Sequence, residues 1–378
     1  MADIAMTDAE RIQLEKHADV DALSTVIPGY WKAHLEEKIK TIHARQVQAG
    51  ITGTSFGLIT DVHVGDNSMH SPALMEKVLT ECGIPYFFNA GDFVTGMGII
   101  KPEDLIGEIK LTCRLFGRIA DRQLMALGNH DPAYSTFLPP DYYAESLSKE
   151  EIYEYVFRSQ TAYSNRVFGE DGTCFYADDA FHKVRYVVLN THNTPSDALR
   201  ADKHPVYDKF RLTGFLQGQV DWFANVALQV PSTDWTVVLC THESIGADEG
   251  TMYYNRDLIL GLINAFRKHT SYKGSTHFDN IVGYDAQVEA DFTGKGGDFA
   301  AWVGGHWHQD NHRICDGVLT ISSINDSLHN SASSAFVHKE RTNTEQSFDI
   351  FTINKKEHKL YATKIGCGED REFTYEVF

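Results

Sequence analysis

Cysteine and long apolar runs are scarce in this sequence, and each absence narrows what the protein can be. Its 378 residues include six cysteines, which are far apart and form no Cys-X-X-Cys pair. We therefore expect buried reduced thiols, and neither a disulfide framework nor a structural zinc site. No apolar run approaches the ~18 residues that a membrane helix needs. The polar, acidic start of the chain lacks the basic-then-apolar order of a secretory signal, so we expect a cytoplasmic or phage-associated protein without a signal peptide or transmembrane segment.

Basic residues are also few. The chain has 34 Lys and Arg against 52 Asp and Glu, which gives a formal net charge of -18. An acidic surface repels phosphate backbones, so nucleic acid is disfavoured as a partner unless a local cationic centre overrides the repulsion. Histidine, with 18 residues, is abundant. The hydrophobic fraction of 42% is ordinary for a globular protein and is enough for a large core.

Residues 8–48 are expected to be helical. Apolar residues recur there at three- to five-residue steps with Glu and Lys between them: Trp31, Leu35, Ile39, Ile42 and Val47. We treat residues 1–50 as an N-terminal helical extension that packs on the body of the protein. The alternative is an arm for docking or oligomerisation.

The following segments alternate between strands and helices. Short apolar runs at 56–60, 84–92 and 123–131 predict strands, and the segments 71–83 and 101–119 predict the helices between them. This order is typical of an α/β protein built from βαβ units.

The alternation is lost from residue 132 to residue 173, which we interpret as an insertion or cap with a helix starting near Ser148. Its tyrosines (Tyr134, Tyr142 and Tyr143) either form an aromatic wall over a cleft or pack within the insertion. Regular elements then resume: strands at 173–179, 184–191, 235–243, 299–308 and 317–324, helices at 218–228 and 256–269, and a C-terminal hairpin at 348–365. The polar segment 325–346 is expected to be a long loop, a kind of segment that is often functional.

Five of the predicted strands end in polar residues of metal-binding types. These are Asp61 and His63, Asp92, Asn129 with His130 and Asp131, His242, and His306 with His308. A single histidine after a strand is more often hydrogen-bonded structure than a ligand. Five such strand ends, which converge on one crevice in an α/β sheet, predict a metal site instead. Glycines next to these residues permit the sharp turns that the site needs, and the Gly-His-Trp-His spacing suits a pair of ions better than one.

The motifs Asp-Val-His, Gly-Asp, Gly-Asn-His-Asp, Thr-His and Gly-His-Trp-His, in this order, resemble the pattern of the calcineurin-like metallophosphoesterases. The resemblance covers about residues 54–325, and the tail at 344–373 is similar to that of bacterial and phage members. It implies a four-layer αββα sandwich with mixed β-sheets, formed by residues 51–378 after the N-terminal extension.

The resemblance also implies roles for individual residues. One metal ion would be held by Asp61, His63 and His308, a second by Asn129, His242 and His306, and Asp92 would bridge the two. The ions would be Mn²⁺, Fe or Zn²⁺, since no thiolate is in the set. A metal-bridging hydroxide would attack phosphorus, His130 would protonate the leaving oxygen, and Asp131 would hold the His130 ring.

Substrate contacts are less defined by the motifs. Asn67 and His70 follow the first ligand pair and either contact substrate or form a solvated loop, and His192 ends a strand beside the expected site. The leading hypothesis is a phosphodiesterase. The alternatives are a phosphomonoesterase or protein phosphatase on the same site, or a phage-associated enzyme that acts on a phosphate-bearing surface polymer. A non-catalytic scaffold would lack some of the ligands, and none is missing.

Overall fold

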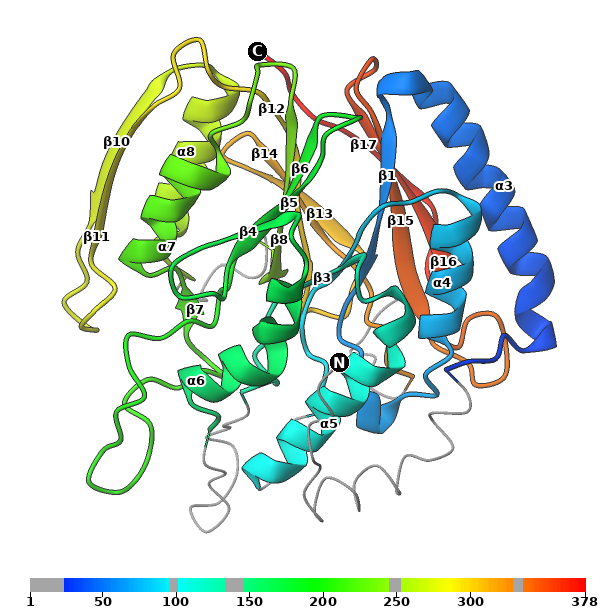
Figure 1. The fold of residues 1–378 in the computed structure, drawn as a ribbon, viewed down its shortest axis with the longest axis horizontal. Coiled ribbons are helices and arrows are strands. Elements are labelled where there is room, and N and C mark those ends of the chain that lie inside the picture. The colour runs from blue at the N-terminus through cyan, green and yellow to red at the C-terminus, as the bar shows by residue number, and fades with distance from the viewer. Residues whose placement is uncertain (1–23, 96–100, 133–145, 245–252, 329–335) are drawn as a thin grey trace.

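The computed structural model describes residues 24–95, 101–132, 146–244, 253–328 and 336–378. Two β-sheets face each other, and helices cover the outer face of each one (Figure 1). This arrangement confirms the predicted four-layer αββα sandwich with mixed sheets. Within the described residues, no helix is long and apolar enough to cross a bilayer.

The first sheet combines parallel strands from the N-terminal half with antiparallel strands from the C-terminus. Its order is β17 (Arg371–Thr374), β16 (Lys359–Gly366), β15 (Ser347–Asn354), β1 (Thr54–Ile59), β2 (Phe87–Asn89) and β3 (Gln123–Met125). β1, β2 and β3 are mutually parallel, so their carboxyl ends lie at the same edge of the sheet. β15 runs antiparallel to β1 and pairs with β16 as a hairpin.

The second sheet has a parallel centre and antiparallel edges. Its order is β13 (Asn311–Cys315), β14 (Val318–Ser322), β12 (Asp298–Gly305), β8 (Thr236–Glu243), β6 (Val184–Val188), β5 (Phe175–Asp179) and β4 (Arg166–Phe168). β6, β8, β12 and β14 are parallel. Because β4 lies in the segment 132–173, the end of that segment is the edge strand of this sheet.

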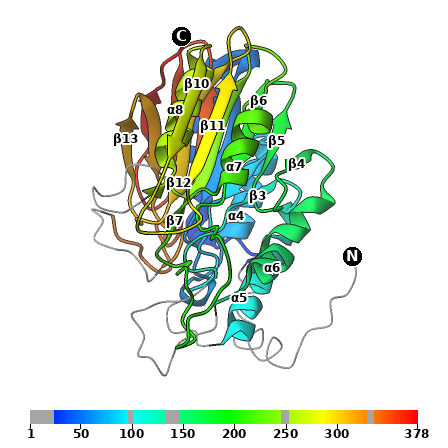
Figure 2. The same ribbon diagram turned by 90° about the vertical axis from the view of Figure 1, so that its left-hand side faces the viewer.

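Helices complete the two outer layers (Figures 1 and 2). On the first sheet lie α3 (Lys32–Ala49) and α4 (Ser71–Glu81), with α5 (Pro102–Leu115) near its lower end in Figure 1. On the second sheet lie α7 (Gln217–Trp222) and α8 (Arg256–Arg267), and the hairpin of β10 (Ser271–Thr276) and β11 (Ala286–Asp291) covers them from outside. The remaining short elements are α6 (Lys149–Ile152), β7 (Thr213–Gly214) and β9 (Tyr253–Tyr254).

The central core lies between the two sheets and is rich in aromatic rings. Phe56 of β1 stacks on Phe351 of β15 with ring centroids 5.1 Å apart. It also meets Tyr186 of β6 in the opposite sheet at 5.5 Å. All three residues are 0% exposed. Full burial of one such side chain contributes about 1.5–3 kcal/mol, so this cluster fixes the sheets face to face.

The N-terminal helix is shorter than the sequence predicts. Residues 24–28 are not helical, and α3 begins at Lys32 after the short turn Gly29–Trp31. Pro28 explains the start, since proline favours an extended residue before it and cannot donate to a preceding helical turn. Residues 8–23 of the predicted helix lie outside the described residues.

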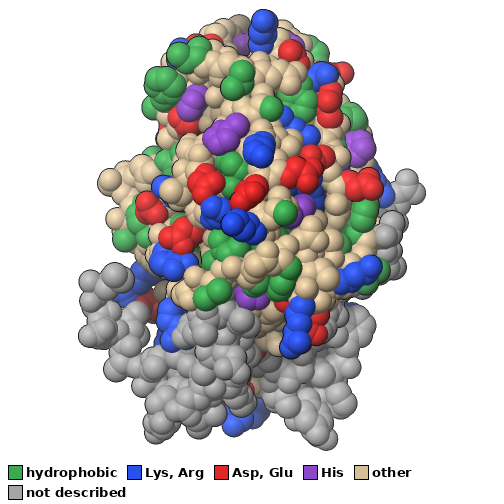
Figure 3. Space-filling view, turned by 90° about the vertical axis from the view of Figure 1, so that its right-hand side faces the viewer, with side chains coloured by type: hydrophobic (Ala, Val, Ile, Leu, Met, Phe, Trp, Pro, Cys, Tyr) green, Lys and Arg blue, Asp and Glu red, His purple; other side chains and the backbone are tan. Residues whose placement is uncertain are grey.

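The apolar face of α3 packs on the first sheet. Trp31, Leu35, Ile39 and Ile42 are buried there. Val47 was wrongly assigned to this face and is 82% exposed, because a five-residue step from Ile42 turns it away from the stripe. Figure 3 shows this side of the molecule with Lys, Arg, Asp and Glu side chains interspersed and the apolar ones separated. Docking or oligomerisation through the helix stays a prediction.

The insertion is described only in part. Residues 133–145, and with them Tyr134, Tyr142 and Tyr143, lie outside the described residues. A helix does begin after Ser148, whose side chain and that of Glu151 form a reciprocal capping box. The sequence analysis missed the β10–β11 hairpin, β13 and β17.

Candidate metal centre

The predicted ligands come from the carboxyl ends of strands in both sheets. β1, β2 and β3 of the first sheet lead to Asp61 and His63, to Asp92, and to Asn129 with His130. His242 lies in β8 of the second sheet, and His306 and His308 follow β12. The structure therefore brings together residues from 61 to 308 at the shared end of the sandwich.

The loops that carry these residues turn sharply. Several of the predicted ligands have left-handed backbone angles: Asp61 (φ 51°), His63 (φ 41°), Asp92 (φ 55°), His306 (φ 73°) and His308 (φ 53°). Left-handed backbone angles cost residues other than glycine about 1–3 kcal/mol, and they occur more often at functional sites than elsewhere. Backbone bonds hold two of the turns, because Asp61 N–H donates to Gly91 O and His63 N–H donates to Asp92 O, each at 3.0 Å.

The first group consists of Asp61, His63 and His308, whose ligand atoms lie within 4.8 Å of one another. His308 Nε2 is 3.1 Å from Asp61 Oδ1. The Nδ1 of His63 lies 2.9 Å from the carbonyl oxygen of Val94, which turns Nε2 toward the group. Burial lowers the pKa of His63 to about 4, so its ring is neutral near pH 7 and has a lone pair to offer a cation.

The second group consists of Asp92, His242 and His306, and Asn129 lies among them. His242 Nε2 is 3.2 Å from Asp92 Oδ2. The amide oxygen of Asn129 is 3.0 Å from His242 Nε2 and 2.9 Å from His306 Nδ1. A carboxylate, an amide oxygen and two imidazoles thus converge at this point.

Asp92 lies between the two groups. Its Oδ2 is 3.2 Å from the Nε2 of His242 and 4.0 Å from that of His63, so the same oxygen faces both sides. Burial by itself would raise the pKa of Asp92, but the imidazoles of His242 and His130 outweigh burial and hold the pKa well below its ordinary value. The carboxylate is therefore ionised and suited to a shared position.

The donor set fits divalent transition ions. His63 Nε2 is buried and has no hydrogen-bond partner among the described residues, although it points at Asp92. His242 Nε2 and His306 Nδ1 face each other at 3.2 Å beside the Asn129 oxygen, which cannot donate. Buried polar atoms are rarely left in this way without a partner or an ion. Imidazole, carboxylate and amide ligands without thiolate suit Mn²⁺, Fe and Zn²⁺.

His130 lies at the mouth of the cluster, but Asp131 does not hold its ring. The Nε2 of His130 is 3.8 Å from Asp92 Oδ2, and its Nδ1 is 2.6 Å from the carbonyl oxygen of Thr95. The carboxylate of Asp131 instead accepts backbone N–H groups of Asp92 and Phe93 at 3.0 and 2.7 Å, and of Gly128 at 2.8 Å. The predicted brace is wrong: Asp131 points away from the ring and ties the β2 and β3 loops together.

None of the predicted substrate residues belongs to a ligand group. Asn67 is a scaffold residue, since its side chain donates to Val62 O and Asp326 and accepts from Gln346. His70 is buried at the N-terminus of α4 and belongs to neither group. His192 is 1% exposed and lies behind His242, with ring centroids 5.7 Å apart. Asn67 and His192 are both buried, and a substrate contact by either stays a prediction.

Sequence reasoning missed Glu243, the last residue of β8. Its carboxylate is buried, 3.6 Å from His306 Nε2 and 3.9 Å from His192 Nε2. Burial would raise the pKa of Glu243, but His306 and His192 outweigh burial and lower it. The sequence did contain a signal for Glu243: an acidic residue follows a predicted ligand histidine directly, at the end of an apolar strand.

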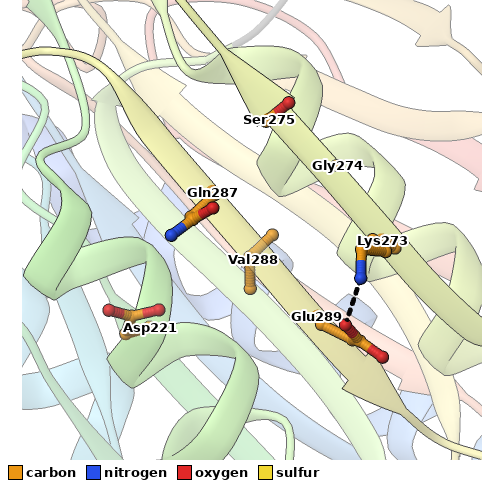
Figure 4. A pocket seen from close by; sticks show the side chains of 7 residues that line it. All are labelled: Asp221, Lys273, Gly274, Ser275, Gln287, Val288 and Glu289. Atoms are coloured by element: carbon orange, nitrogen blue, oxygen red, sulfur yellow. Dashed lines mark hydrogen bonds and ion pairs between the residues drawn. The ribbon is translucent and has the colours of Figure 1, made fainter.

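A hollow on the outer side of the second sheet shares no residue with the ligand groups. It has a volume of about 580 Å³ and lies between α7 and the β10–β11 hairpin (Figure 4). Its charged lining residues include Lys273 and Glu289, which pair with each other at 2.7 Å. This polar surface lacks the converging ligands of the cluster, and the chemistry is assigned to the cluster.

Comparisons with known proteins point to one family. The model of the calcineurin-like phosphoesterases matches residues 54–310. No curated protein matches the sequence. Three similar solved structures have low identity. A conserved protein from Streptococcus pneumoniae, described as a predicted phosphoesterase, has 8% identity and a TM-score of 0.32, and the match covers 85% of this chain and 97% of that one. Vacuolar Protein Sorting 29 from Cryptosporidium parvum has 10% identity and a TM-score of 0.30, with 85% of this chain and 98% of that one covered, and a phosphopantetheinyl hydrolase from Mycobacterium tuberculosis has 11% identity and a TM-score of 0.29, with 73% and 91% covered.

Proposed function

Because the chain belongs to the calcineurin-like phosphoesterase family and is a hydrolase of phosphoric esters, we propose that it cleaves phosphodiesters with two divalent metal ions. The observation that carries the proposal is the pair of ligand groups joined by Asp92. Asp61, His63 and His308 would hold one ion. Asn129, His242 and His306 would hold the other. A carboxylate shared between two cations offsets part of their mutual repulsion.

The ions, when bound, supply positive charge that attracts an anionic ester and lowers the pKa of coordinated water toward neutrality. This local charge accounts for how a chain of net charge -18 takes an anionic substrate. The residues of the chain would fix where the ester lies, because backbone hydrogen bonds hold the turns that carry Asp61 and His63. Mn²⁺, Fe and Zn²⁺ are the candidate ions.

His130 is proposed to protonate the leaving oxygen. Its Nδ1 lies against Thr95 O, which leaves Nε2 directed toward the cluster, 3.8 Å from Asp92 Oδ2. The side chain is 11% exposed and so can reach a bound ester. General acid catalysis of this kind contributes about 10²–10⁴-fold in rate.

Two observations favour a diester over a monoester. In the described part of the cluster, each ion pair joins a histidine to a carboxylate, and Lys and Arg take no part. A diester has one negative charge and a monoester has up to two, so the diester needs less cationic compensation. In addition, Phe210 meets His130 edge-on at 5.0 Å and offers an apolar surface to a second ester group.

The test is to compare a nitrophenyl diester with the matching nitrophenyl monoester, with Mn²⁺ added, alongside metal analysis of the purified protein. We expect close to two transition ions per chain and a higher kcat/KM for the diester. A higher value for the monoester would replace the proposal with a phosphomonoesterase on the same site. If the protein carries its metals but hydrolyses neither the diester nor the monoester, the proposed function is contradicted.

A further inference from the structure

The imidazoles of the cluster are oriented in two different ways. In His63, His242 and His130, Nδ1 lies against a backbone carbonyl oxygen, that of Val94, Ala90 or Thr95, and Nε2 faces the cluster. His306 is reversed: Nδ1 faces Asn129 and His242, and Nε2 faces outward to Glu243. A neutral carbonyl thus lies behind the rings of His63, His242 and His130, and a carboxylate lies behind that of His306.

Packing alone holds His306 less firmly than its neighbours. The His306 side chain is 22% exposed, whereas those of His63 and His242 are 0% exposed. The ring meets Trp307 edge-on at 4.9 Å on one side. A half-open ring of this kind can turn, so its orientation depends on the group behind Nε2. That group is Glu243 Oε1, at 3.6 Å.

Glu243 is itself fixed in place. The parallel pairing of β8 and β12 puts Glu243 opposite Gly305, the residue before His306. Its Oε1 accepts a hydrogen bond from Thr213 Oγ1 at 2.9 Å, and His192 Nε2 lies 3.9 Å away on the far side. His192 is fixed in turn by the contact of its Nδ1 with Lys209 O at 3.1 Å. The carboxylate therefore has little freedom to leave His306.

A buried carboxylate needs hydrogen-bond donors or a paired cation, and Lys or Arg is one source of that cation. Asp349 of β15 follows that pattern, since it contacts both Lys364 and Arg371 at 2.7 Å. The charged neighbours that act on Glu243 are imidazoles. Two of these, His306 and His242, are proposed ligands, so the nearest full positive charge would be a cation on the far side of the His306 ring.

We propose that Glu243 is a positioning residue, which orients His306 so that Nδ1 faces the metal ion. It keeps the ring proton on the outward Nε2 and makes the imidazole a stronger ligand. Partners of this kind behind a ligand histidine typically change metal affinity by about 10–100-fold. The inference rests on the proposed function only in that it requires an ion beside His306.

The experiment compares wild type with Glu243→Gln, which keeps the side-chain shape and the bond from Thr213 but removes the charge. Metal-free protein is titrated with Co²⁺, and the visible absorption of the bound ion reports each binding step separately from activity. Glu345→Gln is the matched control, since Glu345 is also buried but pairs with Tyr30 beside the N-terminal helix. Thr213→Val is the second variant, which removes one support of the carboxylate and keeps its charge.

We expect two binding steps in wild type and in Glu345→Gln. In Glu243→Gln, one step should weaken by about 10–100-fold with an altered absorption spectrum, while the urea midpoint of the metal-free protein stays close to wild type. Thr213→Val should weaken the same step by a smaller factor. Two unchanged steps in Glu243→Gln would overturn the inference and leave the proposed function standing. Absence of the second step in wild type would overturn both.

Discussion

The ring Nδ1 of His130 lies 2.6 Å from the carbonyl oxygen of Thr95. This contact keeps a proton on Nδ1 and leaves Nε2 as the atom that faces substrate, so Nε2 must carry a proton of its own when the ring acts as the acid. Because Thr95 contributes only a backbone oxygen, the orienting group cannot be removed by a side-chain substitution. The role of His130 therefore has to be tested at the histidine itself.

We expect His130→Asn to lower kcat for the nitrophenyl diester by about 10²–10⁴-fold while KM changes little. The variant loses the proton donor but keeps the ligands on the β1, β8 and β12 loops. Steady-state kinetics with metal analysis of the same sample measures both effects. An unchanged kcat in a variant that retains its metals would show that the acid assignment is wrong.

Asp131→Asn should act on stability more than on the proton donor. Its carboxylate accepts backbone N–H groups from Gly128, Asp92 and Phe93, and an amide would turn an NH₂ donor toward some of them. Buried groups left without a hydrogen-bond partner cost about 1–3 kcal/mol, and a loss of that order is expected in urea unfolding. The pH dependence of kcat should keep its shape. A changed alkaline limb, where loss of the His130 proton would lower kcat, with unchanged stability would restore Asp131 as the brace of His130.

Metal removal should lower the thermal midpoint. Without a cation His63 Nε2 has no hydrogen-bond partner among the described residues, and a ligand at about 1,000 times its Kd stabilises the folded state by about 4 kcal/mol. We expect chelation to lower Tm and added Mn²⁺ to restore it. In Asp92→Asn the restoration should be smaller, because this residue faces both ligand groups. An equal response in wild type and variant would exclude a shared role for Asp92.

The site was more predictable than its surroundings, for a physical reason. Asp61, Asp92 and His306 each follow an apolar strand in the sequence, and parallel strands bring such positions to one edge whatever the rest of the chain does. The position of Asp131 was not predictable in this way. Whether its carboxylate faces the next ring or the backbone of the β2 loop depends on loop angles, such as the left-handed φ of Asp92, that the motif does not encode.

Long-range packing sets the other limits of prediction. Helical periodicity shows that Val47 lies off the stripe of Leu35 and Ile42, but it does not show that this stripe packs on the first sheet. Asn67 follows a ligand pair and looks available, but Asp326 and Gln346, more than 250 positions away, engage its amide. Tertiary partners of this kind leave no signal in a local window of sequence.

The buried charge network at the C-terminal strands predicts a specific pH dependence. Burial would raise the pKa of Asp349, but Arg371 and Lys364 outweigh burial and hold it below the ordinary 3.8. A depressed carboxyl pKa stabilises the fold above about pH 3.8, and this stabilisation is lost as pH falls through the folded value. Asp349→Asn should cost about 3–5 kcal/mol at pH 7, with the difference from wild type narrowing below pH ~4. Urea unfolding of both proteins in the presence of a chelator, at pH 7 and below pH ~4, measures this difference in unfolding free energy. A difference that is the same at both pH values would contradict the charge argument.

The N-terminal helix offers a test that separates a packed helix from a docking arm. Trp31 is 0% exposed and packs with Leu35 and Ile42 against the first sheet, whereas Val47 on the same helix is 82% exposed. We expect Trp31→Ala to cost about 3–5 kcal/mol in urea unfolding, as is typical for a buried aromatic. Val47→Ser should leave stability within about 0.5 kcal/mol of wild type, since a surface position away from other contacts contributes little. If the exposed face of α3 docks a partner copy, Val47→Ser would instead shift the oligomeric state measured by light scattering. A Trp31→Ala variant as stable as wild type would mean that α3 is not part of the folded core.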